Sequence, residues 1–295
     1  MKRFLWMLAL SLCLPVCAAL AEVKPLPIDQ RGGYAVSEDN LIAAEEYQDE
    51  SIHVVTQRMT YKQAKCMVLR VTIADPSQLR TAMTRDDYDT KEYVKTKLLA
   101  KKKNSVLAIN GDFFKYNDFG YLVRQGTLYR DRPDAEHDVL LIDDQSDFYV
   151  VPAGDADALY AKVSALEADG RKVINSFNFG PILVNGGEIP KINSSLYQGR
   201  YKMMRLAIGQ LAPLEYAVYF CYGLSDATEG LSLENFADFI KDSTPEVQVA
   251  YNLDGGGSAH VVLLQHQLHN NPSGRDICDL IYFASASDLL GARAE

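Results

Sequence analysis

Polar residues that could do chemistry follow three apolar runs of the chain. Ser105–Ile109 is followed by Asn110-Gly111-Asp112, and Val247–Leu253 by Asp254-Gly255-Gly256-Gly257-Ser258. Between them, Ile182–Val184 leads into Asn185-Gly186. Each run reads as a strand with a polar tip, and rigid strands can deliver such tips to a common rim. We therefore expect the three tips to converge on one site.

Two carboxylates and one arginine are the catalytic candidates. Asp112 and Asp254 fit a pair in which one acts as base or nucleophile at the anomeric carbon of a sugar. Arg205 lies in the apolar run Met203–Gly209, and its forked guanidinium suits a phosphate or a carboxylate. The structural alternatives are aspartates that cap turns and an arginine held in a buried ion pair. Sequence alone does not assign nucleophile and base between the two aspartates.

The neighbouring amides and glycines are candidates for substrate binding. Asparagine side chains would hydrogen-bond sugar hydroxyls, and the glycine run would direct backbone N–H groups at an anion. The alternative is ordinary turn chemistry, with the last motif forming a decorated hairpin. The predicted substrate-binding residues are Asn110, Gly111, Asn185, Gly186, Asn252, Gly255, Gly256, Gly257 and Ser258.

No cofactor is required by the sequence. Asp112 and Asp254, with backbone carbonyls, offer oxygen ligands for a divalent cation, so that alternative stays open. Gly256-Gly257-Ser258-Ala259-His260 lacks the second glycine of a nucleophile elbow, which makes a serine hydrolase using Ser258 the weaker reading. Cys66, Cys221 and Cys278 lie in apolar surroundings and are read either as buried thiols or as one disulfide and one free thiol.

The N-terminus predicts export. Lys2-Arg3, the apolar run Phe4–Leu14 and Ala19-Leu20-Ala21 form a signal peptide over residues 1–21. A lipoprotein acylated on Cys17 is the alternative. No other stretch is long and apolar enough to span a membrane after cleavage, so we expect a periplasmic or extracellular protein. The net charge of −9 becomes −11 without the two leader cations, which argues against a nucleic-acid partner.

The elements that position these residues alternate irregularly between strands and helices. Residues 22–50 are polar and broken by Pro and Gly, which predicts a linker, and residues 51–295 form the main domain. The fold class is α+β, with mixed or antiparallel sheets, helices packed on one face and the site at strand ends. The expected helices are Thr90–Asn104, Ala158–Ala168 and Ser232–Lys241, and the expected hairpin is Gly120–Arg130 with its turn at Gln125-Gly126.

Four segments taken together resemble the phosphodiester glycosidase family. The resemblance covers roughly residues 61–286, and the first and last segments form a specific pair. The segments are Ala108–Phe114, Gly180–Gly186, Arg205–Gly209 and Asn252–Ser258.

The resemblance implies hydrolysis of the bond between a sugar's anomeric carbon and a phosphodiester, with Asp112, Asp254 and Arg205 as the reactive groups. The family's usual Pro-Arg-Thr stands here as Met204-Arg205-Leu206, and His260 replaces a small or hydroxyl residue. These departures leave the substrate open. We expect a phosphorylated glycan or sugar-1-phosphodiester of the cell envelope or an exopolysaccharide. The alternative is a non-catalytic glycan-binding or assembly protein on the same scaffold.

Overall fold

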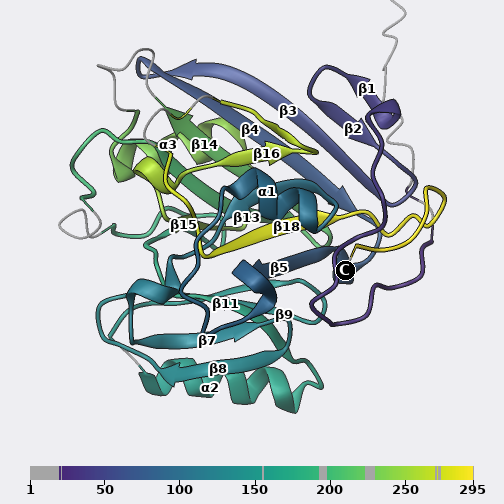
Figure 1. The fold of residues 1–295 in the computed structure, drawn as a ribbon. Coiled ribbons are helices and arrows are strands. Elements are labelled where there is room, and N and C mark those ends of the chain that lie inside the picture. Colours follow the sequence, from purple (N-terminus) through teal and green to yellow (C-terminus); the bar gives the residue numbers. More distant parts are fainter. Residues whose placement is uncertain are drawn as a thin grey trace, which may run out of the picture.

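The computed structural model describes residues 20, 22–154, 156–192, 198–222, 230–269, 271 and 274–294. The expected leader lies outside these residues except for Leu20. Two stacked antiparallel sheets form the body of the molecule, and a smaller group of strands with one helix lies beside them (Figure 1). No helix of the described residues is long and apolar enough to cross a membrane.

The larger sheet has eight strands and carries the glycine motif at one end. All its neighbours are antiparallel, and β14 lies between β4 and β13. Long runs of β-branched and aromatic residues favour these central strands. In spatial order the strands are β1 (Leu41–Ala43), β2 (Glu46–Gln48), β3 (Ile52–Tyr61), β4 (Ala64–Ile73), β14 (Glu215–Tyr222), β13 (Arg205–Ala212), β15 (Val249–Leu253) and β12 (Ile182–Asn185).

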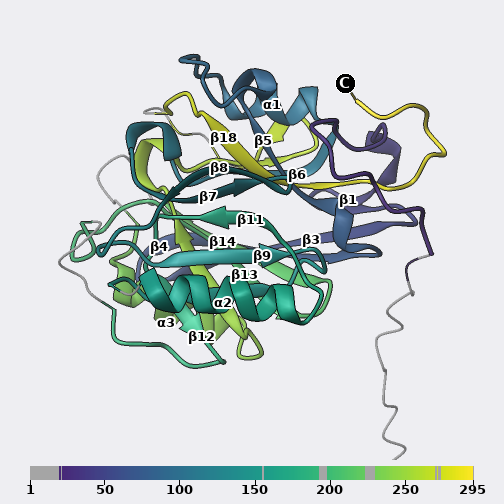
Figure 2. The ribbon, with the colours of Figure 1, turned by 90° about the horizontal axis from the view of Figure 1, so that it is seen from below.

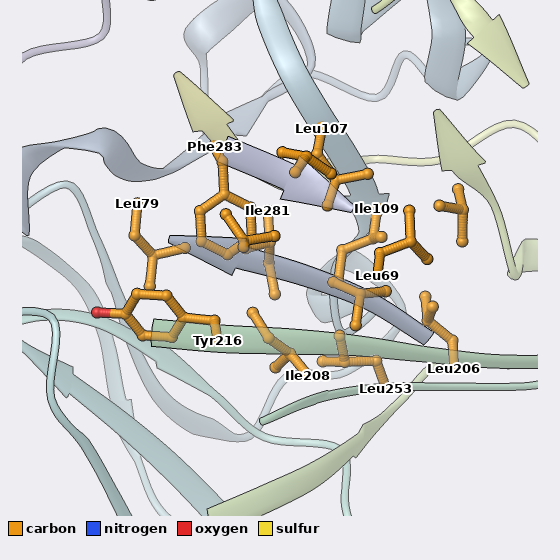
Figure 3. Packing of buried hydrophobic residues seen from close by; sticks show 14 of the residues in the cluster. Leu69, Leu79, Leu107, Ile109, Leu206, Ile208, Tyr216, Leu253, Ile281 and Phe283 are labelled. Atoms are coloured by element: carbon orange, nitrogen blue, oxygen red, sulfur yellow. The ribbon is translucent and has the colours of Figure 1, made fainter. Parts of the chain in front are cut away.

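The second sheet has five strands and packs face to face on the first. Leu69, Ile208 and Leu253 of the larger sheet face Leu107 and Ile281 of the second one in a closed apolar core (Figure 3). Burial of each such side chain stabilises the fold by about 2 kcal/mol. In spatial order the strands are β17 (His266–Gln267), β16 (Val261–Leu263), β6 (Ser105–Asn110), β18 (Asp279–Ala284) and β5 (Leu79–Met83).

Helices cover the outer faces of the two sheets. The helix α3 (Leu233–Ser243) packs Phe236 and Phe239 on the larger sheet. Its N-cap is Ser232, whose hydroxyl accepts from the Asn235 N–H at 3.3 Å. The helix α1 (Thr96–Lys102) packs on β6 and β18 of the five-stranded sheet. The expected α+β class, with each main sheet covered by a helix on one face, is confirmed.

The smaller part of the molecule carries the expected hairpin, which is confirmed. The strands β7 (Gly120–Arg124) and β8 (Thr127–Arg132) form it. A three-stranded sheet of β10 (Phe148–Val151), β9 (Val139–Asp143) and β11 (Val173–Phe177) lies next to it, and α2 (Ala156–Ala168) runs alongside (Figure 2). Short 3-10 turns complete the described elements: η1 (Glu38–Asn40), η2 (Pro76–Gln78), η3 (Thr84–Asp86), η4 (Phe114–Tyr116) and η5 (Gly256–Ser258).

Two segments differ from expectation. The helix expected from Thr90 begins only at Thr96, because Val94 pairs with Ile277 through backbone hydrogen bonds of 3.0 and 2.9 Å. Residues 22–50, expected as a linker, instead supply β1 and β2 of the larger sheet. The buried Arg80 guanidinium also donates to the carbonyl oxygens of Pro27 and Asp29. Tertiary pairing, which local composition does not encode, explains both differences.

Candidate active site

Asp254 follows the last residue of β15, and the glycine turn begins beside it. A Cβ at Gly255 would lie 2.6 Å from the Met204 carbonyl oxygen, and Gly256 has φ 54°. These two positions therefore require glycine for close approach and for left-handed backbone, respectively. The turn closes against Met204, at the start of β13.

The backbone N–H groups of this turn are largely engaged within the protein. Gly256 donates to the Met204 carbonyl at 2.9 Å, and Ser258 donates to the Gly255 carbonyl at 3.1 Å. The Gly255 N–H lowers the pKa of the neighbouring Asp254 carboxyl. Gly256 and Ser258 of the expected anion cradle therefore already donate to protein acceptors, and an anion would need a further donor.

The Asp254 carboxyl is the reactive candidate of this tip. Burial raises its pKa above the usual value, although the Ser258 hydroxyl and the nearby Arg275 cation pull the other way. Arg275 itself is exposed, and its N–H donates to the Gly257 carbonyl at 2.8 Å. A carboxyl with a raised pKa suits proton transfer near neutral pH better than an ordinary aspartate does.

Asn110 joins the tip at residues 110–112 to the tip at residues 254–258. Its Nδ2 donates to the Asp254 carbonyl oxygen at 2.9 Å, and its Oδ1 accepts from the His260 N–H at 3.0 Å. The expected convergence of these two tips is thus observed, while the amide of Asn110 is used to hold them together. Three residues on, Phe113 adopts φ 66°, a conformation that costs energy for a bulky residue and is found at functional sites.

Asp112 belongs to a closed ion cluster. Its Oδ1 accepts from Arg124 Nη2 at 2.7 Å, and its Oδ2 accepts from the Asn178 N–H at 2.8 Å. The same Nη2 donates to Asp279 Oδ2 at 2.9 Å. The three charged side chains are at most 2% exposed. Two carboxylates therefore share one guanidinium in a desolvated setting.

The ion cluster is closely packed, and its packing affects the pKa of Asp279. A Cβ at Gly111 would lie 2.1 Å from Asp279 Oδ2, so only glycine fits there. The Arg124 guanidinium stacks on Phe177 at 4.3 Å from the ring centroid. Burial raises the pKa of Asp279 to about 6; Arg124 opposes this rise and the second carboxylate, Asp112, adds to it.

A small pocket lies between the two tips, with a cavity volume of about 10 Å³, which is room for about one water molecule. Among the described residues, both Asp254 and Asp279 line it, whereas Asp112 does not. The full lining is Asn110, Gly111, Phe113, Asp254, Ser258, Asp276, Ile277, Cys278 and Asp279. Two carboxyls with raised pKa thus face one small space, which is an arrangement for acid–base chemistry.

The backbone of Arg205 lies beside the site, whereas its guanidinium binds other segments of the protein. It is 3% exposed, and burial lowers its pKa to about 10. The guanidinium donates to the carbonyl oxygens of Leu231, Gln198 and Tyr201 at 3.0–3.1 Å. These bonds fix the segments that flank β13, which supports the glycine turn. In this arrangement, Arg205 stabilises the backbone on which the glycine turn rests.

The third tip lies elsewhere. Asn185 pairs with Val249 at the start of β15, five residues before Asp254, which corresponds to about 17 Å along a strand. Because β12 runs antiparallel to β15, its end carries Asn185 and Gly186 away from the pocket, contrary to the expected convergence. Asn252 is at the correct end, but it is 1% exposed and its Nδ2 donates to the Gly180 carbonyl at 2.7 Å.

Three charged residues of the site were not identified from the sequence. Arg124 ends an apolar strand, Asp279 stands within the apolar run Ile277–Ala284, and Arg275 lies in a polar loop. A charge within an apolar strand signals a buried partner, so Arg124 and Asp279 were detectable in principle. Nothing local marks Arg275. In the part of the chain described, no group of three His, Cys, Asp or Glu side chains is placed to hold a metal ion.

Several solved structures share the fold of this chain. A zebrafish N-acetylglucosamine-1-phosphodiester alpha-N-acetylglucosaminidase catalytic domain, auto-inhibited by its pro-peptide, shares the fold with a TM-score of 0.61 and 18% identity over 86% of this chain and 87% of that one. A hypothetical protein from Synechocystis aligns with a TM-score of 0.58 and 15% identity, over 82% of this chain and 64% of its own.

A putative exported protein from Burkholderia pseudomallei K96243 has the same fold, with a TM-score of 0.51 and 14% identity over 75% of this chain and 74% of that one. No curated protein sequence matches the chain. The model of the phosphodiester glycosidase family, NAGPA, matches residues 103–284, which is more than half of the sequence and contains every element of the pocket. The chain belongs to the phosphodiester glycosidase family.

Proposed function

We propose that the protein is an exported hydrolase that cleaves the glycosidic bond of a sugar-1-phosphodiester, on glycans of the cell envelope or an exopolysaccharide. The observation that carries this proposal is the Asp254 carboxyl, which lines the pocket with a raised pKa inside the region matched by the family. An aspartate carboxyl that faces the pocket can act as the base or the nucleophile at the anomeric carbon.

The leaving group explains how few groups the reaction needs. A phosphate monoester departs readily, so strong general acid catalysis matters less than in ordinary glycosidases. Asp254 then attacks the anomeric carbon or deprotonates the attacking water. Asp279, facing the same pocket, is the second carboxyl available for proton transfer. Asp112 stays bound to Arg124 and the Asn178 N–H, which suits a role in setting the charge of the site.

Arg275 is our candidate for binding the phosphate. Its side chain is exposed beside the glycine turn, and its positive charge acts to lower the pKa of Asp254. A forked guanidinium matches phosphate geometry. Arg205, predicted for this task, instead holds three backbone carbonyls, and we assign it the positioning of β13. Among the predicted sugar-binding residues, Ser258 lines the pocket and remains a candidate for contacting substrate.

The test is release of free sugar from a panel of hexose-1-phosphodiesters. The panel includes an N-acetylglucosamine-1-phosphodiester, because the zebrafish structure is named for that substrate. We expect Asp254→Asn to abolish turnover, and Arg275→Ala to raise KM at least tenfold with a smaller change in kcat. Arg132→Ala, which changes an exposed arginine of β8, is the matched control and should behave as wild type.

The possible results distinguish the proposed hydrolase from its alternatives. Full activity of Asp254→Asn would overturn the proposed chemistry, provided circular dichroism shows that the variant is folded. Saturable binding of the whole panel without any release of sugar would support the alternative of a non-catalytic glycan-binding protein. An Arg205→Ala variant that stays folded and loses only kcat would return the catalytic role to Arg205.

A further inference from the structure

Two of the three described cysteines stand directly opposite each other in neighbouring strands. Cys66 of β4 and Cys221 of β14 are partners in the antiparallel register. Their side chains belong to one apolar cluster, on the face of the larger sheet that α3 covers. Cys66 is 1% exposed and Cys221 0% exposed, and the Cys66 thiol adds to the rise that burial causes in the pKa of Cys221.

This placement meets the distance requirement of a disulfide. Directly opposed residues of an antiparallel pair have Cα atoms about 4.5–5.5 Å apart and side chains on the same face. A disulfide spans Cα separations of about 4.4–6.8 Å. Cys278 offers no comparable geometry, because it packs beside Met83 and Leu122 next to the five-stranded sheet and its thiol faces Asp279 Oδ1 at 3.6 Å.

We propose that Cys66 and Cys221 form a cross-strand disulfide when the chain folds in the presence of a disulfide oxidant, and that Cys278 stays a free thiol. In the first step, the thiolate of one cysteine attacks a sulfur of the oxidant and releases one oxidant thiol. The second cysteine then attacks the mixed disulfide and releases the other. One S–S bond forms in the protein, the S–S bond of the oxidant is reduced to two thiols, and the two cysteine protons end on those thiols.

The reaction belongs to folding and not to the finished structure. Burial raises the pKa of Cys66 to about 12 and also raises that of Cys221, so neither thiol is a nucleophile once α3 covers the sheet. A chain that folds reduced therefore stays reduced under mild oxidant, and a chain that folds oxidised keeps its bond.

The bond would reinforce the support of the glycine turn. On the other side of β14, Cys221 pairs in register with Arg205 of β13, and the Cys221 thiol lies 3.8 Å from the Met203 carbonyl oxygen. The neighbouring Met204 carbonyl holds Gly256. A bond between β4 and β14 would hold β14 in place, and β14 is the strand that pairs with this part of β13.

Tryptic peptide mapping of the full chain tests the proposal, because Cys66, Cys221 and Cys278 fall on three different peptides. Cleavage after Lys and Arg places Cys66 in residues 66–70, Cys221 in 206–241 and Cys278 in 276–293. The denatured, reduced chain is refolded with oxidised and reduced glutathione, alkylated in denaturant and digested without reductant. A parallel sample is folded reduced before it meets the same glutathione buffer.

In the refolded sample, we expect the peptide pair 66–70 and 206–241 joined, at the summed mass less two hydrogens, with 276–293 alkylated. In the sample folded first, all three peptides should be alkylated. Cys278→Ala should keep the bond and Cys66→Ala should abolish it. Three alkylated peptides after oxidative refolding, or a bond to Cys278 or to the leader cysteines, overturns the proposal. Ready oxidation of the folded, reduced chain would contradict the proposal that the bond forms during folding.

Discussion

Asp279→Asn removes one of the two carboxylates that surround the Arg124 guanidinium. The wild-type cluster holds two carboxylates and one cation, all at most 2% exposed, so full ionisation leaves an uncompensated buried charge. In the variant, the amide oxygen can keep the contact with Arg124, and the amide nitrogen can face the Cys278 sulfur, a weak acceptor. Arg124 and Asp112 then form a balanced pair.

The magnitude follows from the pKa of Asp279, which is raised from 3.8 to about 6. A group whose pKa is raised on folding favours the folded state when protonated, below about pH 3.8. That contribution is lost as the pH rises through about 6. At about 1.4 kcal/mol for each pH unit, ionising Asp279 lowers the free energy of unfolding by about 3 kcal/mol. The variant should therefore match wild type near pH 4 and exceed its stability by up to about 3 kcal/mol at pH 8.

The assay is urea unfolding of both proteins at intervals from pH 4 to pH 8. The quantity compared is the difference between their free energies of unfolding, because groups remote from the cluster titrate equally in both. Asp118→Asn, which alters an exposed aspartate, reports the effect of removing one surface carboxylate. A difference that is flat with pH would refute the reasoning. So would a wild-type protein that is the more stable one at pH 8, since that would mean Arg124 holds Asp279 ionised.

Three further outcomes test the site. Arg124→Met leaves two carboxylates without their cation and should cost about 3–5 kcal/mol in urea unfolding at pH 8; a cost below about 1 kcal/mol would contradict the cluster. Gly111→Ala places a methyl group 2.1 Å from Asp279 Oδ2 and should destabilise by about 1–3 kcal/mol, so an unchanged urea midpoint would argue against this packing. The acid limb of kcat/KM should lie above pH 3.8, because Asp254, the base that we propose, must be ionised and burial raises its pKa; a limb at or below that value would remove Asp254 as the base.

The strands and helices were largely predictable because their signals are local. The hairpin turn carries Gly126 at a φ of 75°, and α3 begins after the N-cap Ser232; both residues are local signals for these structures. The helix expected from Thr90 starts late because Val94 pairs with Ile277, a contact between segments far apart in the chain. Residues 22–50 likewise gain their structure from β3 and Arg80 and not from their own composition.

By itself, the sequence determined that polar tips follow apolar strands and that Asp112 and Asp254 belong to one family pattern. Only the tertiary structure decided which tips meet. Strand direction carried Asn185 away from the pocket, whereas the Asn110 amide brought Asp254 to the end of β6. Burial then separated the roles: it bound Asp112 and Arg205 to internal partners and left Asp254 facing the pocket with Asp279. Ionisation and hydrogen bonding depend on three-dimensional surroundings, so residue type and spacing alone cannot make that separation.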